Sequence, residues 1–398
     1  MGSLKVYNTL TKRKEPFRTL AKGRVRMFVC GPTVQGPIHA GHARTYIFYD
    51  VVARYLAHLG YKVEFLVNVT DIDERITAAA REERVDPLAF ASRYAEFFFE
   101  DMNSLGIASV TRFERVSNHV SDAIDLVSDL VRKGRAYRRD GWVYFDTSSF
   151  PNFGALSGLT KAELARHPLE LSPRKKNLAD FSLWRPEVLV DGLWNSPWGL
   201  GSPGWHIQDT AITSSVFGPQ YDIHGGAYEL IYPHHEAEIA QGESISGVSP
   251  MVRYWVHTHL VTTEGEKMSK SVGNVYTVRD ALRRHSKDEL RYYFLLTHYR
   301  KDMDLSGLDV AAKRLGELRR KVRRLGHPTP SGGADAASHL GGFLEAMNDD
   351  FNTPVAIKEL ESLVRTVDAR PSPGKAMEVL EALELASGIL GVDILGKQ

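Results

Sequence analysis

The sequence predicts an α/β fold with a parallel sheet, and three consecutive segments near the N-terminus carry that prediction. The run 25–31, VRMFVCG, is apolar and β-branched and stops at Gly-Pro, as is typical of a strand buried on both faces. Segment 43–60 has apolar residues at helical spacing and closes on Gly60, which suits a helix C-cap. The run 61–71, YKVEFLVNVTD, returns as a second strand. Strand, helix and strand form a βαβ unit with a right-handed crossover, and a ligand is expected at the carboxyl ends of its strands.

Along the rest of the chain the spacing of the apolar residues changes several times. Residues from about 80 to 135 have the apolar spacing of helices, and residues from about 136 to 200 resemble short strands and turns. The sheet resumes with 220–241 and 251–261, and the chain is helical in pattern from about 306. This order predicts a parallel-sheet domain with an insertion, followed by a helical bundle.

Composition narrows the class of protein. A length of 398 residues predicts two or three domains, and the net charge of +1 carries no global signature of nucleic-acid binding. The single cysteine excludes an internal disulfide and fits a reducing compartment, so we expect a cytoplasmic protein. The N-terminal segment has no apolar core of a signal peptide, and we expect no membrane span.

The loop between the first strand and its helix is the first candidate site. Glycines in VCGPTVQGPIHAGHAR (29–44) leave backbone N–H groups unpaired at a helix start, which is an anion-binding arrangement. His39 and His42, three residues apart, can donate to phosphate oxygens, and Gly41 lets a base or ribose approach the backbone. From spacing alone, a tight turn with two structural histidines is an equal alternative.

A second loop, GEKMSKSVGN (265–274), places Lys267 and Lys270 between glycines. Ammonium groups near a triphosphate would neutralise charge on a departing pyrophosphate. Taken alone, such a pair of lysines is usually a solvated surface feature.

These motifs carry a resemblance. HAGH (39–42) looks like the first signature of the class I aminoacyl-tRNA synthetases, and KMSKS (267–271) is identical to the second. Longer stretches, among them FVCGPTVQGPIHAGHAR, NVTDIDERI, SPWGLGSPGWHI and DIHGGAYELIYPHHEAEIAQ, resemble cysteinyl-tRNA synthetases in order and spacing. The resemblance implies a class I Rossmann-type catalytic domain with an inserted α/β domain and a C-terminal helical bundle. It divides the chain into a first catalytic half (1–115), an inserted connective domain (116–200), a second catalytic half (201–262), a KMSKS-containing segment (263–305) and a tRNA-contacting bundle (306–398).

The resemblance also implies a two-step reaction in which L-cysteine is activated by ATP with Mg²⁺ and then transferred to tRNA(Cys), by a monomeric protein. His39, His42, Lys267 and Lys270 would be the catalytic residues. The implied ATP-binding residues are Gly31, Thr33, His39, Gly41, His42, Gly225, Gly226, Glu229, Lys267, Met268, Ser269 and Lys270. Glu229 stands where the family usually has aspartate, a likeness that implies contact with the ribose hydroxyls.

A metal site is implied near the amino acid. His234 and Glu238 lie four apart after Pro233, so one helix face can present both to an ion, although such pairs are most often surface pairs. In the family these positions and Cys30 match zinc ligands, and zinc selects cysteine by binding its thiolate. Cys30, Thr70, Trp205 and His206 match residues of the amino-acid pocket.

The chain departs from the family pattern in two places. Asp209 occupies the position of the fourth zinc ligand, usually a cysteine, and a Cys30/Asp209/His234/Glu238 site is harder but chemically possible. Members of the family usually continue after the bundle into a small anticodon-reading domain, and because the sequence stops at Gln398 we expect a short form without it. The basic face of the helix after 306 can still follow tRNA phosphates; its members are Lys313, Arg314, Arg319, Arg320, Lys321, Arg323 and Arg324.

Three alternatives stay open. A ligase of the same ancestry can give the cysteinyl group to a small amine, as the mycothiol-pathway cysteine ligase does. A non-catalytic paralogue can bind nucleotide or tRNA for regulation. More remotely, the HxGH signature also occurs in nucleotidyltransferases.

Overall fold

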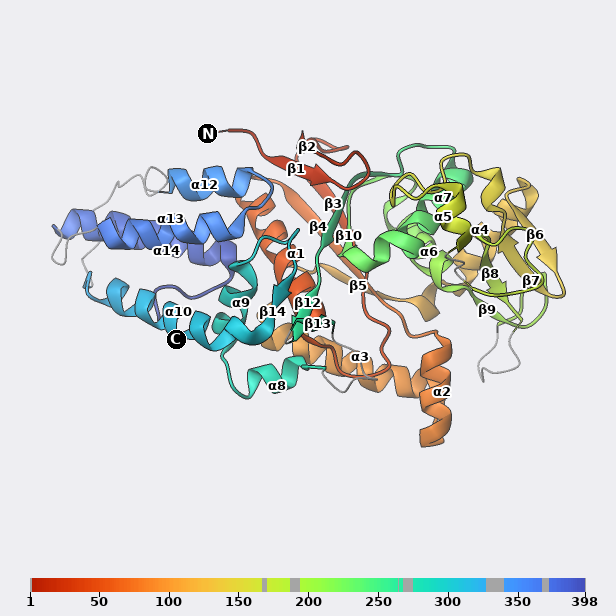
Figure 1. Ribbon diagram of the computed structural model, residues 1–398, viewed down its shortest axis with the longest axis horizontal. Coiled ribbons are helices and arrows are strands. Elements are labelled where there is room, and N and C mark those ends of the chain that lie inside the picture. The colour runs from red at the N-terminus through yellow and green to blue at the C-terminus, as the bar shows by residue number, and fades with distance from the viewer. Residues whose placement is uncertain are drawn as a thin grey trace.

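A five-stranded parallel sheet forms the centre of the computed structural model, which describes residues 2–166, 170–186, 194–263, 265–267, 275–326, 340–366 and 372–397. The spatial order of the strands is β11, β10, β3, β4, β5, and every neighbouring pair is parallel. The strands are β3 (Arg24–Val29), β4 (Lys62–Val69), β5 (Arg112–Arg115), β10 (Tyr221–Ala227) and β11 (Val252–Thr258). Figure 1 shows this sheet in the middle of the molecule, with the C-terminal helices on one side of it and the inserted sheet on the other.

The strand order has one reversal. From β3 the chain first builds outward through β4 and β5, and it later returns to add β10 and β11 on the other side of β3. The carboxyl ends of β3 and β10 therefore form the switch point of a doubly wound sheet, where such folds bind ligands.

Both faces of the sheet are buried, and alternation along β3 sets which side chain goes to which face. Val25, Met27 and Val29 pack into a core with α1, whereas Phe28 packs into a second core with α6 and α7. The first core includes α1 (Ala40–His58) and α3 (Pro87–Ser104) and continues into the C-terminal helices. The second includes α4 (Val120–Arg132), α6 (Trp205–Phe217) and α7 (Glu236–Ser246). Helix α2 (Glu74–Glu83) connects β4 to α3.

A second sheet lies in the insertion. It is antiparallel in the order β6, β7, β8, β9 and shares the second core with α4 and α6. Its elements are β6 (Ala136–Arg139), β7 (Trp142–Phe145), β8 (Phe181–Arg185) and β9 (Ser202–Pro203), with α5 (Lys161–Arg166) between β7 and β8. An N-terminal hairpin, β1 (Lys5–Asn8) with β2 (Arg13–Pro16), contacts β11.

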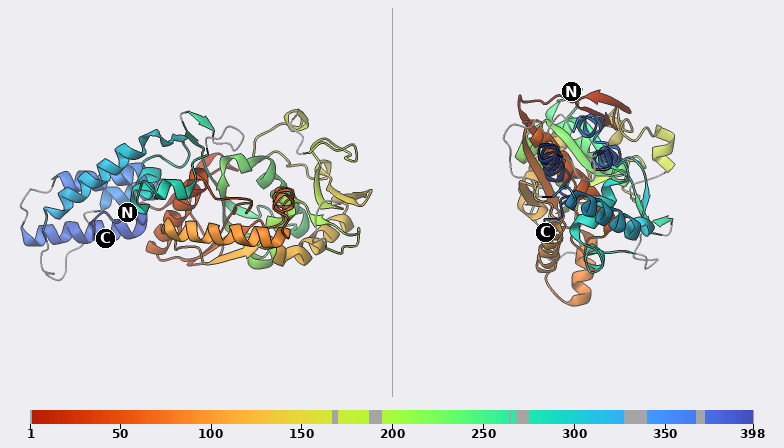
Figure 2. Two further views of the ribbon diagram at one scale, coloured as in Figure 1. Left: turned by 90° about the horizontal axis from the view of Figure 1, so that it is seen from below. Right: turned by 90° about the vertical axis from the view of Figure 1, so that its left-hand side faces the viewer.

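The C-terminal part combines a small sheet with a bundle of helices. The small sheet has the order β13, β12, β14, and the bundle extends away from the central sheet, as the left-hand view in Figure 2 shows. The elements are β12 (Val261–Thr263), β13 (Glu266–Lys267), α8 (Val278–Leu282), α9 (Lys287–Leu295), β14 (Met303–Asp304), α10 (Leu308–Arg323), α12 (Gly341–Asn348), α13 (Thr353–Thr366) and α14 (Pro373–Leu390). A fully buried ion pair of 2.6 Å between Arg291 of α9 and Asp50 of α1 joins the bundle to the part of the chain that holds the central sheet.

The predicted fold class is confirmed, including the parallel sheet, the inserted strands and the helical C-terminal part. Gly60 has a φ of +88° directly after α1, as its predicted position at the helix end requires. The helical pattern over 80–135 was wrong at β5, because a strand of only four residues shows too few alternations to stand out. The five-segment division stays a prediction. Among the described residues, no helix has the length and apolarity to cross a membrane.

Candidate functional site

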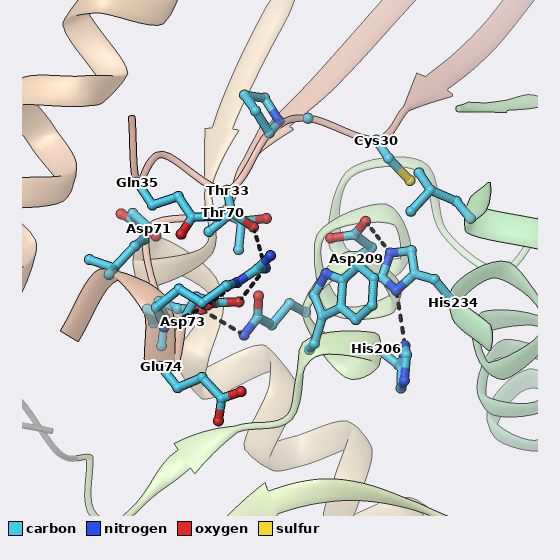
Figure 3. Close-up of a pocket in the computed structure, with 18 of the residues that line it drawn as sticks. Cys30, Thr33, Gln35, Thr70, Asp71, Asp73, Glu74, His206, Asp209 and His234 are labelled. Atoms are coloured by element: carbon cyan, nitrogen blue, oxygen red, sulfur yellow. Dashed lines mark hydrogen bonds and ion pairs between the residues drawn. The ribbon is translucent and has the colours of Figure 1, made fainter. Parts of the chain in front are cut away.

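A cavity of about 860 Å³ lies at the carboxyl ends of β3, β4 and β10, at the predicted switch point. Several predicted site residues line it together: Cys30, Gly31, Thr33, His39, Gly41, His42, Thr70, Trp205, His206, Asp209, Glu229 and His234. Figure 3 shows Cys30, Asp209 and His234 on one side of the cavity and Thr33, Thr70, Asp73 and Glu74 on the other.

The HAGH motif forms the first turn of α1. His39 is the N-cap residue, and its Nδ1 accepts a hydrogen bond of 3.1 Å from the backbone N–H of Gly41. The Nδ1 of His42 accepts in turn from the backbone N–H of His39 at 3.3 Å. The two imidazoles therefore form a reciprocal capping box in place of the usual hydroxyl and carboxylate.

Capping fixes the protonation of His42. Because its Nδ1 accepts a hydrogen bond, the neutral ring carries its proton on Nε2. Burial, with a smaller contribution from nearby His39, lowers the pKa of His42 to about 3. At neutral pH the His42 ring is thus an uncharged donor beside a helix N-terminus, which suits a phosphate oxygen.

The second signature is only partly described. Lys267 ends β13, which pairs with β12, and Met268, Ser269 and Lys270 lie outside the described residues. Arg44 ties α1 to the start of this small sheet, since its guanidinium donates to the carbonyl oxygens of His259 and Leu260 at 2.9 and 2.7 Å. It also donates to the carbonyls of His298, at 3.1 Å, and Lys301.

Three predicted ATP-site glycines are held close to other protein atoms. A Cβ on Gly31 would stand 1.5 Å from the carbonyl oxygen of Asn68, and one on Gly225 would stand 2.4 Å from the ring of Tyr49. A Cβ on Gly226 would meet the ring of His235 at 3.0 Å. Close packing is thus a sufficient reason for these glycines, and their predicted contacts with ATP stay a prediction.

Four buried side chains converge beside the cavity as a candidate metal centre. The potential ligand atoms of Cys30, Asp209, His234 and Glu238 all lie within 4.8 Å of one another. His234 Nε2 is 3.0 Å from Asp209 Oδ2 and 3.3 Å from Glu238 Oε1. Helix α7 begins at Glu236, three residues after the predicted start at Pro233, so His234 lies in the π-helical turn before the helix and still faces Glu238.

Local structure explains how these four residues meet. Cys30 follows β3 and continues the alternation that turns Phe28 toward α6 and α7. Asp209 lies one turn into α6, and Asn68 of β4 holds it by donating to Oδ1 at 2.7 Å. The ring of Trp205 stacks on that of His234 with centroids 4.2 Å apart.

The chemistry of this set fits a divalent cation. Among the described atoms, both carboxylate oxygens of Glu238 are buried without a hydrogen-bond partner, which is costly unless a cation compensates. Burial, and secondarily the charge of Asp209, raises the pKa of Glu238 well above its usual range, and burial raises that of the Cys30 thiol. A divalent ion would reverse both effects by stabilising the ionised ligands.

The residues predicted for the amino-acid pocket lie together at the cavity, beside others that the sequence did not single out. His206 Nδ1 lies 3.0 Å from His234 Nδ1, and Thr70 Oγ1 accepts from Asn68 at 3.2 Å. The buried residues Asn68, His224, His235 and His257 had not been predicted. A concentration of histidines in the segments around 224, 234 and 257 was the only available signal.

Comparisons with known proteins agree with this geometry. A family model described as the tRNA synthetases class I (C) catalytic domain matches residues 16–314, and a DALR domain model matches residues 342–395. The methionyl-tRNA synthetase of Mycobacterium tuberculosis, solved with methionyl-adenylate, superposes with a TM-score of 0.68 over 92% of each chain at 18% identity. This likeness is one of fold. The class defined by fold and family model is that of the class I tRNA synthetases.

Relatives identify the branch of that class. The cysteine–tRNA ligase of Heliobacterium modesticaldum is 41% identical over 99% of this chain and 88% of its own length. That of Thermoplasma acidophilum is 40% identical over 97% of this chain and 88% of its own length. The chain belongs to the cysteine–tRNA ligase family. The predicted family is therefore confirmed, while the roles assigned to single site residues stay predictions.

Proposed function

We propose that the chain activates L-cysteine with ATP and transfers the cysteinyl group to the 3′ end of tRNA(Cys), releasing pyrophosphate and AMP. One observation carries this proposal. The ten residues from Cys30 to His39 connect a candidate metal centre that contains a thiol with a helix N-terminus suited to a phosphate, both at the same cavity. Membership of the cysteine–tRNA ligase family supports the same reaction.

In the first step the cysteine carboxylate attacks the α-phosphorus of ATP, and the bond to pyrophosphate breaks. Side chains contribute by positioning and by stabilising charge. His39 and His42 would donate to phosphate oxygens at the N-terminus of α1, and Lys267 and Lys270 would neutralise the leaving pyrophosphate with Mg²⁺. In the second step a ribose hydroxyl of tRNA attacks the acyl carbon, and AMP leaves.

The metal centre would supply selectivity. Zn²⁺ held by Cys30, Asp209, His234 and Glu238 would favour a thiolate over the hydroxyl of serine, because sulfur is the softer ligand. Trp205, His206 and Thr70 would enclose the rest of the amino acid, and Glu229 would bind ribose hydroxyls at the cavity wall.

The bundle would contact tRNA through the basic face of α10, but two of its predicted residues pair with other helices of the bundle, and Arg320 lies 3.9 Å from Glu317 within α10. Arg314 pairs with Glu361 of α13 at 2.5 Å, and Arg319 pairs with Asp288 of α9 at the same distance. These two arginines therefore join helices of the bundle. Exposed residues of the same face remain for the phosphates: Lys313, Arg320, Lys321, Arg323 and Arg324. We further propose that the protein acts in the cytoplasm as a monomer.

Amino-acid-dependent exchange of pyrophosphate into ATP, run with each of the twenty amino acids, tests activation. We expect exchange with cysteine alone, and its absence would contradict the proposed first step. Charging of total tRNA with labelled cysteine then tests the acceptor. Exchange with cysteine but no charging would instead support the small-amine ligase.

A further inference from the structure

We propose that Cys30, His224, His235 and Glu238 form a second, inner metal position behind the cavity. It shares Cys30 and Glu238 with the set described above, so the inference concerns the same cluster. It does not depend on cysteine activation. The potential ligand atoms of the inner set also lie within 4.8 Å of one another.

Two imidazoles converge on the one thiol of the chain. Cys30 Sγ lies 3.1 Å from Nε2 of His235 and 3.4 Å from Nε2 of His224. Adjacent nitrogen and sulfur ligands of a tetrahedral zinc ion are roughly 3.6 Å apart, as bond lengths of about 2.0 and 2.3 Å require. The two rings are thus close to a coordinating arrangement before any ion is added.

The far side of each ring is supported as in metal-bound histidines. His224 Nδ1 lies 2.7 Å from the hydroxyl of Tyr221, and His235 Nδ1 lies 2.8 Å from Nε2 of His257. The second chain of contacts continues from His257 Nδ1 to the hydroxyl of Thr9 at 2.8 Å. Such partners fix the ring orientation and leave Nε2 directed at the ion.

The buried carboxylate of Glu238, which both sets share, also indicates a cation in this cluster. The side chain is fully buried, and neither carboxylate oxygen has a hydrogen-bond partner among the described residues. Oε1 lies 3.3 Å from Nε2 of His234 and 4.0 Å from Nε2 of His235, so this one oxygen is near an imidazole of each set, whereas Oε2 lies 3.7 Å from Nδ1 of His224. One carboxylate can therefore serve either position.

The two positions differ in access. Cys30, Asp209 and His234 line the cavity, but among the described lining residues His224, His235 and Glu238 are absent. An ion in the inner set is enclosed by protein, as structural zinc ions are, whereas the outer set faces a substrate. The presence of Asp209 also favours zinc binding at the inner position. Beside the shared thiol, the outer set offers one imidazole and two carboxylates, whereas the inner set offers two imidazoles and one carboxylate.

X-ray absorption of the zinc-loaded full chain, without substrate, tests the inner position directly. We expect one sulfur and two imidazole neighbours of zinc. A single imidazole would overturn the inference, as would failure to bind zinc. This measurement needs no variant and so does not depend on how substitutions fold.

Two matched variants add a second readout, with zinc affinity measured by competition with a chelator. His235→Gln should raise the Kd for zinc by more than about 100-fold, beyond what loss of a supporting partner causes. Asp209→Asn, a change at the outer set alone, should raise it by less than about 10-fold. The reverse order of the two effects would overturn the inner position.

Addition of L-cysteine separates this inference from the proposed function. Because the inner set is enclosed, a second sulfur neighbour together with only one imidazole is expected if cysteine binds the metal at the outer set as proposed. If no second sulfur is found while two imidazoles are present before addition, the inner position stands and the proposed role of the metal fails.

Discussion

The rings of His39 and His42 lie with centroids 4.0 Å apart and cap one turn of α1 reciprocally through their Nδ1 atoms. In each residue Nδ1 thus caps the helix, and Nε2 has the proposed catalytic role of donating to a phosphate oxygen. Substitutions that keep one task and remove the other can separate them.

His39→Asn should keep the cap, since asparagine is a preferred N-cap residue, but it removes the Nε2 donor. We expect the rate of pyrophosphate exchange to fall by about 10²- to 10³-fold with stability changed by less than about 0.5 kcal/mol. His39→Ala should add a loss of about 1 kcal/mol in the free energy of unfolding. Equal rates for His39→Asn and the parent protein would show that this imidazole only caps the helix.

Cys30→Ser should remove the sulfur ligand shared by both metal positions. We expect zinc content to fall to less than about 0.1 ion per chain, because a serine hydroxyl is a much poorer zinc ligand. The preference for cysteine over serine in exchange should fall by about 100-fold. Elemental analysis and exchange kinetics check the two outcomes, and a preference retained without zinc would contradict the thiolate model.

Arg44→Lys should loosen the small sheet that leads to Lys267. One ammonium cannot replace a guanidinium that donates to four carbonyls, so buried acceptors are left unpaired. We expect a loss of about 2 kcal/mol or more in the free energy of unfolding and a 10- to 100-fold slower exchange, about what misplaced groups cause.

The matched control for Arg44 is Arg54→Lys, on the same helix. Arg54 pairs with Asp50 at 2.8 Å on the side of the bundle, away from the small sheet. The Arg54→Lys substitution should lower the free energy of unfolding and have little effect on the rate of pyrophosphate exchange. Slow exchange in both variants would mean that the effect of Arg44 is only one of stability.

His298 should make stability depend on pH. Burial, with nearby Arg300 and two lysines, lowers its pKa to about 4. As the pH falls below about 6.5, the unfolded chain takes up this proton before the folded protein does, so stability present at neutral pH is lost toward pH 4. In denaturant unfolding between pH 7 and 5, His298→Gln should reduce the pH slope by up to about 1.4 kcal/mol per unit. An unchanged slope would contradict this assignment.

The sequence by itself determined the family, the parallel sheet and the loop that ends at His39 and His42. Local patterns were sufficient there, because β3, α1 and β4 are consecutive and their apolar spacing directly records which faces are buried. Strand β5 was missed because its four residues show too few alternations to stand out from the helical pattern around them.

Only the tertiary structure decided which polar residues meet. Residues 30, 209 and 238 come from three elements far apart in sequence, and the doubly wound order of the sheet brings them together. The spacing of residues along the chain does not indicate which distant residues come into contact, so Asn68, His224 and His235 could not be recognised from the sequence as neighbours of this site. Burial at the shared face of β3, α6 and α7 makes their polar contacts necessary, since unpaired groups there would be costly.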